Sequence, residues 1–265
     1  MKRGVYKAQK KDGSIYYRAS ITFSEKHISL SSFDTEKEAH KAYVEAGKLL
    51  LSTAPADDYH ATLRSLPFSK WVSLVNFRDN GIYSASPVYL YKTYFFYYLA
   101  PGDYLIFDNE DLFYYSSHRI IRRGNRLFVS DYGSQIGILT RYGVRIHAVP
   151  GRDYRFKNGD SSDLRVSNIE VLNSYFGVTR TACEGRVVFE ASIHINGYSR
   201  IGFYNTPEEA AVAYNKAADM LMKEGIKRKY SLNYIESLKP SVYAKMYAET
   251  EIPDSVFEAF SRMQG

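Results

Sequence analysis

The chain has 265 residues, a formal net charge of +6 and a hydrophobic content of 45%, which is ordinary for a folded protein of one large domain or two to three small ones. Its single cysteine, Cys183, excludes a disulfide framework and a cysteine-rich zinc site, and it favours a reducing compartment such as the cytoplasm. No apolar run approaches the roughly 20 residues that span a bilayer, so we expect no membrane role and no signal peptide.

Positive charge gathers in two segments of the chain. Residues 1–30 hold seven Lys and Arg against two acids, and residues 118–157 hold nine against two, whereas residues 231–265 hold three against five. Such a concentration is typical of a surface that faces phosphates. A solvated basic face is the alternative interpretation.

Residues 4–46 predict three strands followed by a helix. Period-two alternation over residues 16–23 and 27–33 indicates half-buried strands. Asp34 or Thr35 then caps a helix whose small alanines recur at three-and-four spacing, so that the helix can lie close across the sheet. One face of this sheet is therefore expected to be core and the other to be free.

The centre of the chain is less regular. Residues 68–77 predict a short helix, and residues 87–99 form an aromatic stretch that predicts a strand or a buried helix, for which packing is a better explanation than base stacking. Residues 103–171 predict short strands with turns at Asn109-Glu110, Gly124-Asn125, Gly133 and Asn158-Gly159.

Residues 177–217 repeat the first pattern about 170 residues later. Asn196-Gly197 predicts a tight hairpin turn between its second and third strands. Alternation places Ile201 and Phe203 inward and Tyr198, Arg200 and Gly202 outward. After this repeat, residues 240–249 and 253–263 predict two short amphipathic helices.

Both repeats resemble the Apetala-2/ethylene-response-factor type of DNA-binding domain. Its signature is Gly-Val, an aromatic-x-Ala-x-Ile strand, and then Leu-Gly-x-Phe-x-Thr-x-Glu-Glu-Ala-Ala-x-Ala-Tyr. The first copy has Ser31 where the glycine usually lies, and Ser231-Leu232-Asn233-Tyr234 is similar to a Leu-Asn-Phe phrase that often follows the domain. The second copy keeps Ile201-Gly202, Thr206, Glu208-Glu209-Ala210-Ala211 and Ala213-Tyr214.

The resemblance implies that each three-stranded sheet enters the major groove with its outward side chains. Carried over by position, the DNA contacts are Arg3, Tyr6, Ser20, Thr22, His27 and Ser29 in the first copy, and Thr179, Ser192, His194, Tyr198 and Arg200 in the second. Lys7, Arg18 and Arg180 would add attraction that does not depend on sequence. Arg200 is the first candidate for reading a base, since arginine binds guanine in bidentate fashion. These faces hold fewer arginines than the plant domains, so plant-type sequence preference is not expected.

The middle segment resembles the HNH nuclease region of homing endonucleases. The family pattern Asp-His-x-Asn-Gly-Asp-x-x-Asp-Asn-Arg-x-x-Asn-Leu corresponds to residues 155–169, with Phe156 at the position of the metal-ligand histidine. The catalytic histidine position holds Thr140, before Arg141. HNH cleavage needs a histidine base and ligands for a divalent ion, so the resemblance implies lost catalysis with no metal and no cofactor.

Basic residues of the middle segment would still hold a DNA backbone, because phosphate contacts need only cations and hydrogen-bond donors. Those with this expected role are Arg122, Arg123, Arg126, Arg141, Arg155 and Lys157. Alternatively, some arginines of this segment form salt bridges with Asp131, Asp153, Asp160 or Asp163.

The sequence thus predicts an α+β protein in which two domains, each a three-stranded antiparallel sheet plus a helix, flank a small mixed α/β HNH-like domain. The expected segments are an Apetala-2-like domain (1–52), a helical and aromatic connector (53–100), a degenerate HNH-like domain (101–173), a second Apetala-2-like domain (174–238) and a helical tail (239–265). The expected function is non-catalytic binding of double-stranded DNA by a cytoplasmic repressor or DNA-organising protein, derived from a homing-endonuclease-like ancestor of a phage or mobile element.

Two alternatives remain open from the sequence. One is a phage or mobile-element protein that binds and inhibits a host defence nuclease, for which a composition with 25 tyrosines is suitable. The other is an active HNH endonuclease that uses His118 and His147.

Overall fold

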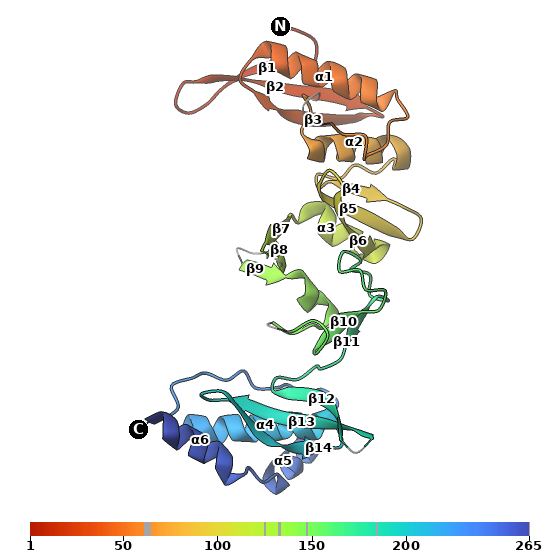
Figure 1. Ribbon diagram of the computed structural model, residues 1–265. Coiled ribbons are helices and arrows are strands. Elements are labelled where there is room, and N and C mark those ends of the chain that lie inside the picture. Colours follow the sequence, from red (N-terminus) through yellow and green to blue (C-terminus); the bar gives the residue numbers. More distant parts are fainter. Residues whose placement is uncertain (61–64, 125, 132–133, 147, 184, 265) are drawn as a thin grey trace. The chain divides into compact units, whose positions relative to one another are not determined.

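The computed structural model describes residues 1–60, 65–124, 126–131, 134–146, 148–183 and 185–264. It divides into two compact units: unit 1 holds Met1–Ile138 and Asp160–Asn168, and unit 2 holds Leu139–Gly159 and Ile169–Gly265. Small antiparallel sheets and six α-helices lie within the described ranges, so the expected α+β class is confirmed (Figure 1). The predicted turn residues Asn125 and Gly133, together with His147, lie outside the described residues.

The first sheet begins unit 1. Strands β1 (Val5–Gln9), β2 (Ile15–Phe23) and β3 (Lys26–Phe33) pair antiparallel in chain order, and helix α1 (Glu36–Leu50) lies across one face (Figure 1). Thr35 is the N-cap residue, because its hydroxyl accepts from the backbone N–H of Glu38 at 3.2 Å while the Glu38 carboxylate accepts from the backbone N–H of Thr35 at 3.3 Å. This capping box starts the helix at the position that the sequence indicates.

A β-bulge interrupts the pairing of β2 with β3. Ser20 lies opposite Ser29 but the preceding residue, Ala19, lies opposite Ser31, so Leu30 is an extra residue on β3. Beyond the extra residue, the inward and outward positions of the strand are exchanged relative to strict alternation.

Helix α2 (Phe68–Asn80) closes the core beneath the first sheet. Its side chains Trp71, Leu74 and Val75 are buried in one cluster with the inward residues of the sheet and of α1. The helix ends at Gly81, whose φ of 69° is the left-handed conformation that favours glycine at this position.

The aromatic stretch forms strands. In the sheet of β4 (Val88–Leu90), β5 (Tyr94–Ala100) and β6 (Asp103–Asp108), the side chains of Phe95, Tyr97 and Tyr98 are at most 2% exposed, so they serve packing. A 3-10 helix (Asn109–Asp111) and the short helix α3 (Leu112–Ser117) follow, where the sequence analysis placed a turn at Asn109-Glu110.

Unit 1 is completed by a third sheet and a distant segment. The sheet consists of β7 (Ile120–Arg123), β8 (Arg126–Asp131) and β9 (Ser134–Gly137). Residues 160–168 join β6 of the same unit: the backbone N–H of Ile106 donates to Ser162 at 2.9 Å and its carbonyl accepts from Leu164 at 2.8 Å.

Unit 2 begins at Leu139, within a 3-10 helix (Ile138–Tyr142), and continues with a two-stranded sheet of β10 (Tyr154–Phe156) and β11 (Ile169–Val171). The predicted middle domain, residues 101–173, therefore contributes to both units. The domain boundaries given above remain a prediction.

The second three-stranded sheet lies in unit 2. Strands β12 (Val178–Cys183), β13 (Arg186–His194) and β14 (Tyr198–Tyr204) pair antiparallel, and helix α4 (Pro207–Lys223) lies across one face (Figure 1). Thr206 and Glu209 form a capping box, and Pro207 occupies the first helical turn. The pairing of β13 with β14 has a bulge at Ile201, because Ala191 lies opposite Gly202 and Ser192 opposite Arg200.

A glycine and a tyrosine make the same contact in both copies. Gly4 and Gly177 have φ values of 76° and 68°, and a Cβ on either would overlap the ring of Tyr43 or Tyr214 in the following helix. Each glycine carbonyl also accepts from the backbone N–H of the serine at the bulge. A residue with a side chain fits neither position, which explains the Gly-Val start of both repeats.

The tail packs on the second core. Helices α5 (Pro240–Glu249) and α6 (Asp254–Gln264) confirm the two predicted helices, and Val256 and Phe260 of α6 are buried against the helix and sheet of unit 2. Across the described ranges, every helix is too short or too polar to cross a membrane.

Candidate nucleic-acid interface

The face of the first sheet that α1 does not cover is polar. Tyr6 lies opposite Arg18, which lies opposite Ser32, and these three side chains are exposed. Because directly paired residues share a face, they form a row across all three strands. We call the set Tyr6, Arg18, Ser20, Thr22, His27, Ser29 and Ser32 the first open face.

Arg18 is the cation of the first open face. Its Nη2 donates to the Tyr16 hydroxyl at 2.6 Å, and its guanidinium carbon lies 5.4 Å from the centre of the Tyr16 ring. Arg18 makes no ion pair with any residue that the structure describes. Its charge is therefore available to an external anion.

Hydroxyl and imidazole groups extend this face along the strands. The Thr22 hydroxyl and His27 Nδ1 lie 3.3 Å apart, on a directly opposed pair. Ser20 is only 7% exposed, and its Oγ has no hydrogen-bond partner among the described residues. A buried hydroxyl without a partner is uncommon, and this one is covered by surrounding atoms rather than open to an external group.

Two predicted contacts of the first copy lie outside the open face. Lys7 is opposite Tyr17, an inward residue of β2, so its exposed side chain leaves the sheet on the helix side of the edge. Arg3 precedes β1 and is exposed. Both positions suit contact with a nucleic-acid backbone beside the groove, which for Lys7 is the expected attraction that does not depend on sequence.

The second open face has different chemistry. Thr179, Glu190 and Phe203 form its row across the three strands, and Ser192 lies opposite Arg200. The prediction that Phe203 points inward is wrong: Phe203 is 46% exposed, because the extra residue Ile201 reverses the phase of β14. For the same reason Gly202 pairs with the buried Ala191 and lies on the inward side.

Arg200 is held on two sides. Its Nε donates to the Glu190 carboxylate at 3.1 Å, and its guanidinium carbon lies 4.8 Å from the centre of the Phe203 ring. Neither partner was assigned a role from the sequence. The sequence does place an acid and an arginine on neighbouring predicted strands. Whether the two side chains meet depends on the register, which the bulge shifts by one residue.

His194 and Tyr198 lie at the end of this face. They are directly opposed, with their rings edge to face at 5.1 Å, and Tyr198 is 74% exposed. Arg228, which follows α4, places Nη1 at 2.6 Å from His194 Nδ1. Since a guanidinium only donates, His194 accepts at Nδ1, and a neutral ring then carries its proton on Nε2.

Arg180 is exposed but lies opposite Phe189, an inward residue, so it belongs to the edge of the sheet rather than to the second open face. Its backbone N–H donates to the Asn173 side chain at 2.7 Å. Thr179 lies on the open face as expected.

The loop that resembles the HNH end pattern is held by its own side chains. Asp163 is buried, and Arg165 donates to it through Nε and Nη2 at 2.8 and 2.6 Å. The Asn168 side chain donates to the Asp163 carbonyl at 2.8 Å, and Asp160 Oδ1 accepts from the Ser162 backbone N–H at 2.8 Å. These residues hold the shape of the loop.

The two positions that the resemblance gives to catalytic histidines have ordinary structural roles. Phe156 pairs with Ile169 in the β10–β11 sheet and contacts Tyr154 edge to face, and Thr140 lies in a 3-10 helix. Among the residues described here, no three His, Cys, Asp or Glu side chains are grouped so as to hold a metal ion. His118 Nδ1 lies 2.8 Å from the Tyr114 carbonyl, and its ring stacks on Tyr114.

The basic residues of the middle segment divide into paired and opposed groups. Arg122 forms two hydrogen bonds with Asp103, and Arg155 pairs with Glu170 across β10 and β11 at 2.6 Å. Arg123 and Arg126 lie directly opposite each other and are exposed. Like charges in that position repel, so a bound anion would relieve them.

Of the other two predicted cations, Arg141 lies in the 3-10 helix and Lys157 in the turn after β10, and both are exposed.

The alternative of internal salt bridges is correct for Asp153 and Asp163. Burial by itself would raise the pKa of Asp153, but hydrogen bonds from Arg152 and from the Val149 backbone and the charge of Arg145 hold it below its ordinary value. This carboxylate therefore remains ionised at neutral pH and anchors its loop.

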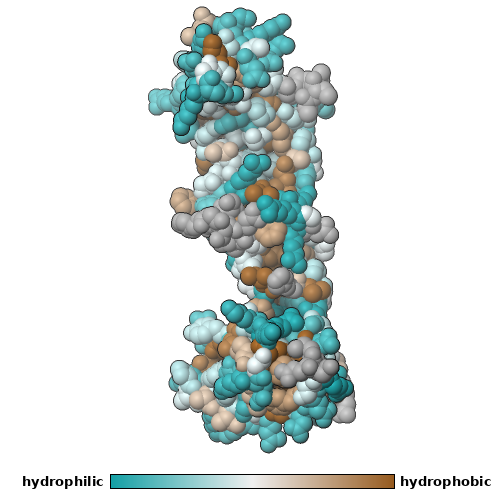
Figure 2. Space-filling view, turned by 90° about the vertical axis from the view of Figure 1, so that its left-hand side faces the viewer, coloured by the Kyte–Doolittle hydropathy of each residue, from teal (hydrophilic) through white to brown (hydrophobic). Residues whose placement is uncertain are grey.

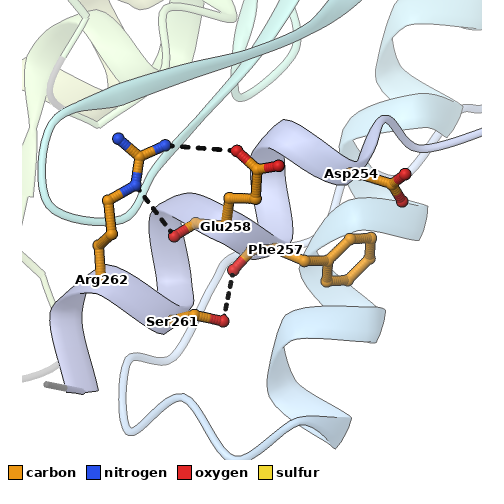
Figure 3. Close-up of a pocket in the computed structure, with 5 residues that line it drawn as sticks. All are labelled: Asp254, Phe257, Glu258, Ser261 and Arg262. Carbon is orange, nitrogen blue, oxygen red and sulfur yellow. Dashed lines mark hydrogen bonds and ion pairs between the residues drawn. The ribbon is translucent and has the colours of Figure 1, made fainter.

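A shallow pocket of about 460 Å³ lies on α6 (Figure 3). Two of its polar groups bond along their own helix, since Arg262 Nη2 contacts Glu258 at 3.5 Å and the Ser261 hydroxyl donates to the Phe257 carbonyl at 3.1 Å. All five lining residues come from one helix, so polar groups from separate elements do not converge there as in a typical ligand site.

Comparisons of the chain with protein-family models, curated proteins and solved structures found no match.

Proposed function

We propose that this protein binds double-stranded DNA without cutting it, through the first open face and with further contacts from the second. The observation that carries the proposal is the first open face itself: a polar row with an arginine that has no counter-ion within the described part of the chain, on a sheet whose other face is used by the core. The surface around this sheet is largely hydrophilic at the top of Figure 2.

The dimensions of the sheet suit the major groove. Three strands about 4.8 Å apart make a surface about 10 Å wide, and the major groove of B-DNA is about 12 Å wide. Hydroxyl groups on the exposed Thr22 and Ser29 can both donate and accept, so they can contact base edges or phosphate oxygens.

The basic residues away from this face add attraction. Arg3 and Lys7 flank the first sheet, and Arg123 and Arg126 form an opposed pair in the same unit. Each phosphate neutralised releases counter-ions, so binding through these groups becomes weaker as salt increases.

A non-catalytic role is the second part of the proposal. At the positions where the HNH resemblance requires histidines, Phe156 has no lone pair to offer a metal and Thr140 is no general base at neutral pH. The loop residues Asp160, Asp163 and Asn168 are occupied by contacts within the loop. A repressor or a DNA-organising protein of phage or mobile-element origin, in the cytoplasm, fits such a chain.

The test is binding of a labelled random-sequence duplex, followed by fluorescence anisotropy over a range of salt. If three cations meet phosphates, affinity falls about 40-fold between about 50 and about 200 mM salt. Arg18→Ala should weaken binding about fivefold and reduce the salt slope by about 1. Lys41→Ala is the matched control, because Lys41 is an exposed cation on α1.

Three results would contradict the proposal: no binding of duplex DNA, binding that does not depend on salt, or equal effects of the Arg18 and Lys41 variants. Nicking of a supercoiled plasmid with magnesium or manganese would overturn the non-catalytic part, and His118→Ala would then identify whether that histidine is used.

Inhibition of a host nuclease is the second candidate. It is favoured by the exposed Tyr198, Phe203 and Val187 of the second sheet. Against it, most of the described tyrosines are buried, such as Tyr97, Tyr98, Tyr115 and Tyr214, or half-buried. DNA binding therefore has the stronger support.

A further inference from the structure

The second open face holds a pre-arranged hydrogen-bonding group. Glu190 and Phe203 are cross-strand partners, and Arg200 contacts both, through its Nε and through the plane of its guanidinium. Arginine loses much rotamer freedom when it binds a ligand, and a guanidinium held in advance loses less. Arg18 is also held by a hydrogen bond and a ring, both from Tyr16, and Arg200 differs from it in having a carboxylate as one of its partners.

The carboxylate lies deeper than the guanidinium that it holds. The Arg200 side chain is 61% exposed and the Glu190 side chain 27%. Glu190 accepts from Nε, and the four N–H groups on Nη1 and Nη2 have no partner among the described residues, so they remain for a ligand. If the pair served only to neutralise charge, a bidentate contact of both Nη groups with the carboxylate would be more favourable. Arg122 makes such a contact with Asp103.

The remaining edge of Arg200 has the chemistry of a guanine reader. Two donors of one planar group match the O6 and N7 acceptors that guanine presents in the major groove. A guanidinium already paired with a carboxylate gains less from a bare phosphate, because part of its charge is compensated. Ser192, directly opposite Arg200, and His194 offer further hydrogen-bonding groups for the adjacent bases.

We propose that Glu190 and Phe203 are positioning residues that hold Arg200 to select guanine, so that the second sheet supplies sequence preference while the first sheet grips phosphates. This inference rests on the proposed DNA binding and goes beyond it, since it assigns different tasks to the two copies.

The experiment starts with the intact chain and a random pool of duplexes, from which bound sequences are selected. Affinity is then measured for a selected duplex, for the same duplex with 7-deazaguanine in place of guanine, and for an unselected duplex. We expect the selected sites to share a guanine whose replacement weakens binding about tenfold. Arg200→Lys should abolish that difference, because a lysine cannot make the two parallel bonds.

The positioning role has its own readout. Glu190→Gln keeps an acceptor but removes a negative charge, so preference for the selected duplex should fall several-fold while binding of the unselected duplex is unchanged or tighter. Phe203→Leu should lower the preference in the same way. Arg18→Ala is the contrast, since it should weaken binding of both duplexes equally.

The possible failures are distinguishable. If wild-type protein binds duplexes but enriches no guanine, or if Arg200→Lys retains the full preference, the inference is overturned and DNA binding stands. If wild-type protein binds neither duplex, the proposed function itself fails. Weaker binding of both duplexes by Glu190→Gln would mean that Glu190 has a structural role only.

Discussion

The two sheet-and-helix copies share their construction and differ in what they present. Both have a glycine packed under a helix tyrosine, a bulge opposite an Ala-Ser pair, and a Thr-x-x-Glu capping box. Their open faces carry cations on different strands: Arg18 of the first copy corresponds in register to Glu190 of the second, and Ser29 corresponds to Arg200. The scaffold is constant and the surface chemistry varies, as is usual for binding sites carried on one fold.

The copies also differ in the segments that pack against the helix of each copy, α1 in the first and α4 in the second. In the first, α2 adds apolar side chains to the core. In the second, Asn233 bonds to the Asn215 side chain of α4 through its backbone and to the Phe176 backbone through its side chain, at 2.6 to 3.1 Å. Asn215 takes the place of Val44 in the first helix, the residue after the shared tyrosine. The second copy thus adds this asparagine pair, a polar latch, to the apolar packing of α6 on its core.

The largest expected effect tests what the copies share. Gly4→Ala and Gly177→Ala should each cost about 3 to 4 kcal/mol, because a Cβ meets the helix tyrosine and the backbone has positive φ. The single tryptophan, Trp71, lies in unit 1, so urea unfolding followed by its fluorescence should shift for Gly4→Ala only. Gly81→Ala, with positive φ and no atom within 4 Å, is the control and should cost about 1 kcal/mol. Equal losses of unfolding free energy for Gly4→Ala and Gly81→Ala would contradict the claim that contact with Tyr43 requires a glycine at position 4.

A second prediction tests the polar latch. Asn233→Ala should cost about 3 kcal/mol, because it leaves the backbone N–H and carbonyl of Phe176 with unmet hydrogen bonds, while the backbone bonds of residue 233 to Asn215 remain. The neighbouring Tyr234 is 87% exposed, and Tyr234→Ala should change stability by less than about 0.5 kcal/mol. Circular dichroism during urea unfolding measures both variants. Similar stabilities for the two would show that the latch contributes nothing.

The smallest effect concerns the helix caps. Thr35→Ala and Thr206→Ala should each lower the free energy of unfolding by about 1 kcal/mol, since each removes one half of a capping box. Thr35→Ser and Thr206→Ser keep the hydroxyl and should restore most of the loss. Unequal losses in the two copies, measured in the same urea titrations, would show that the shared motif is not energetically equivalent.

Local signals made much of this fold predictable. The capping boxes, the Asn196-Gly197 turn and the alternating strands are encoded by neighbouring residues, so the helices after both sheets begin where the sequence indicates. The side of each strand was predictable only as far as the bulge. The sequence does not show that Ile201 is an extra residue in the pairing, so strict alternation wrongly predicts that Phe203 faces the core.

The candidate site was predictable in part for the same reason. Alternation identifies Ser20, Thr22, His27 and Ser29 as outward without knowledge of the partners. The contact of Arg200 with Glu190 depends on the register between two strands, and the contact of Arg228 with His194 joins residues 34 apart. Such pairings are decided by packing of the whole unit, which a single sequence does not display.

The course of the chain between β10 and β11 has a consequence for dissecting the molecule. Residues 139–159 belong to unit 2, residues 160–168 to unit 1, and the chain then returns to unit 2. No single cut separates the units: a fragment that ends before residue 160 loses the backbone bonds to Ile106, and one that begins after residue 168 loses β10. The smallest intact pieces of this protein are therefore discontinuous in sequence.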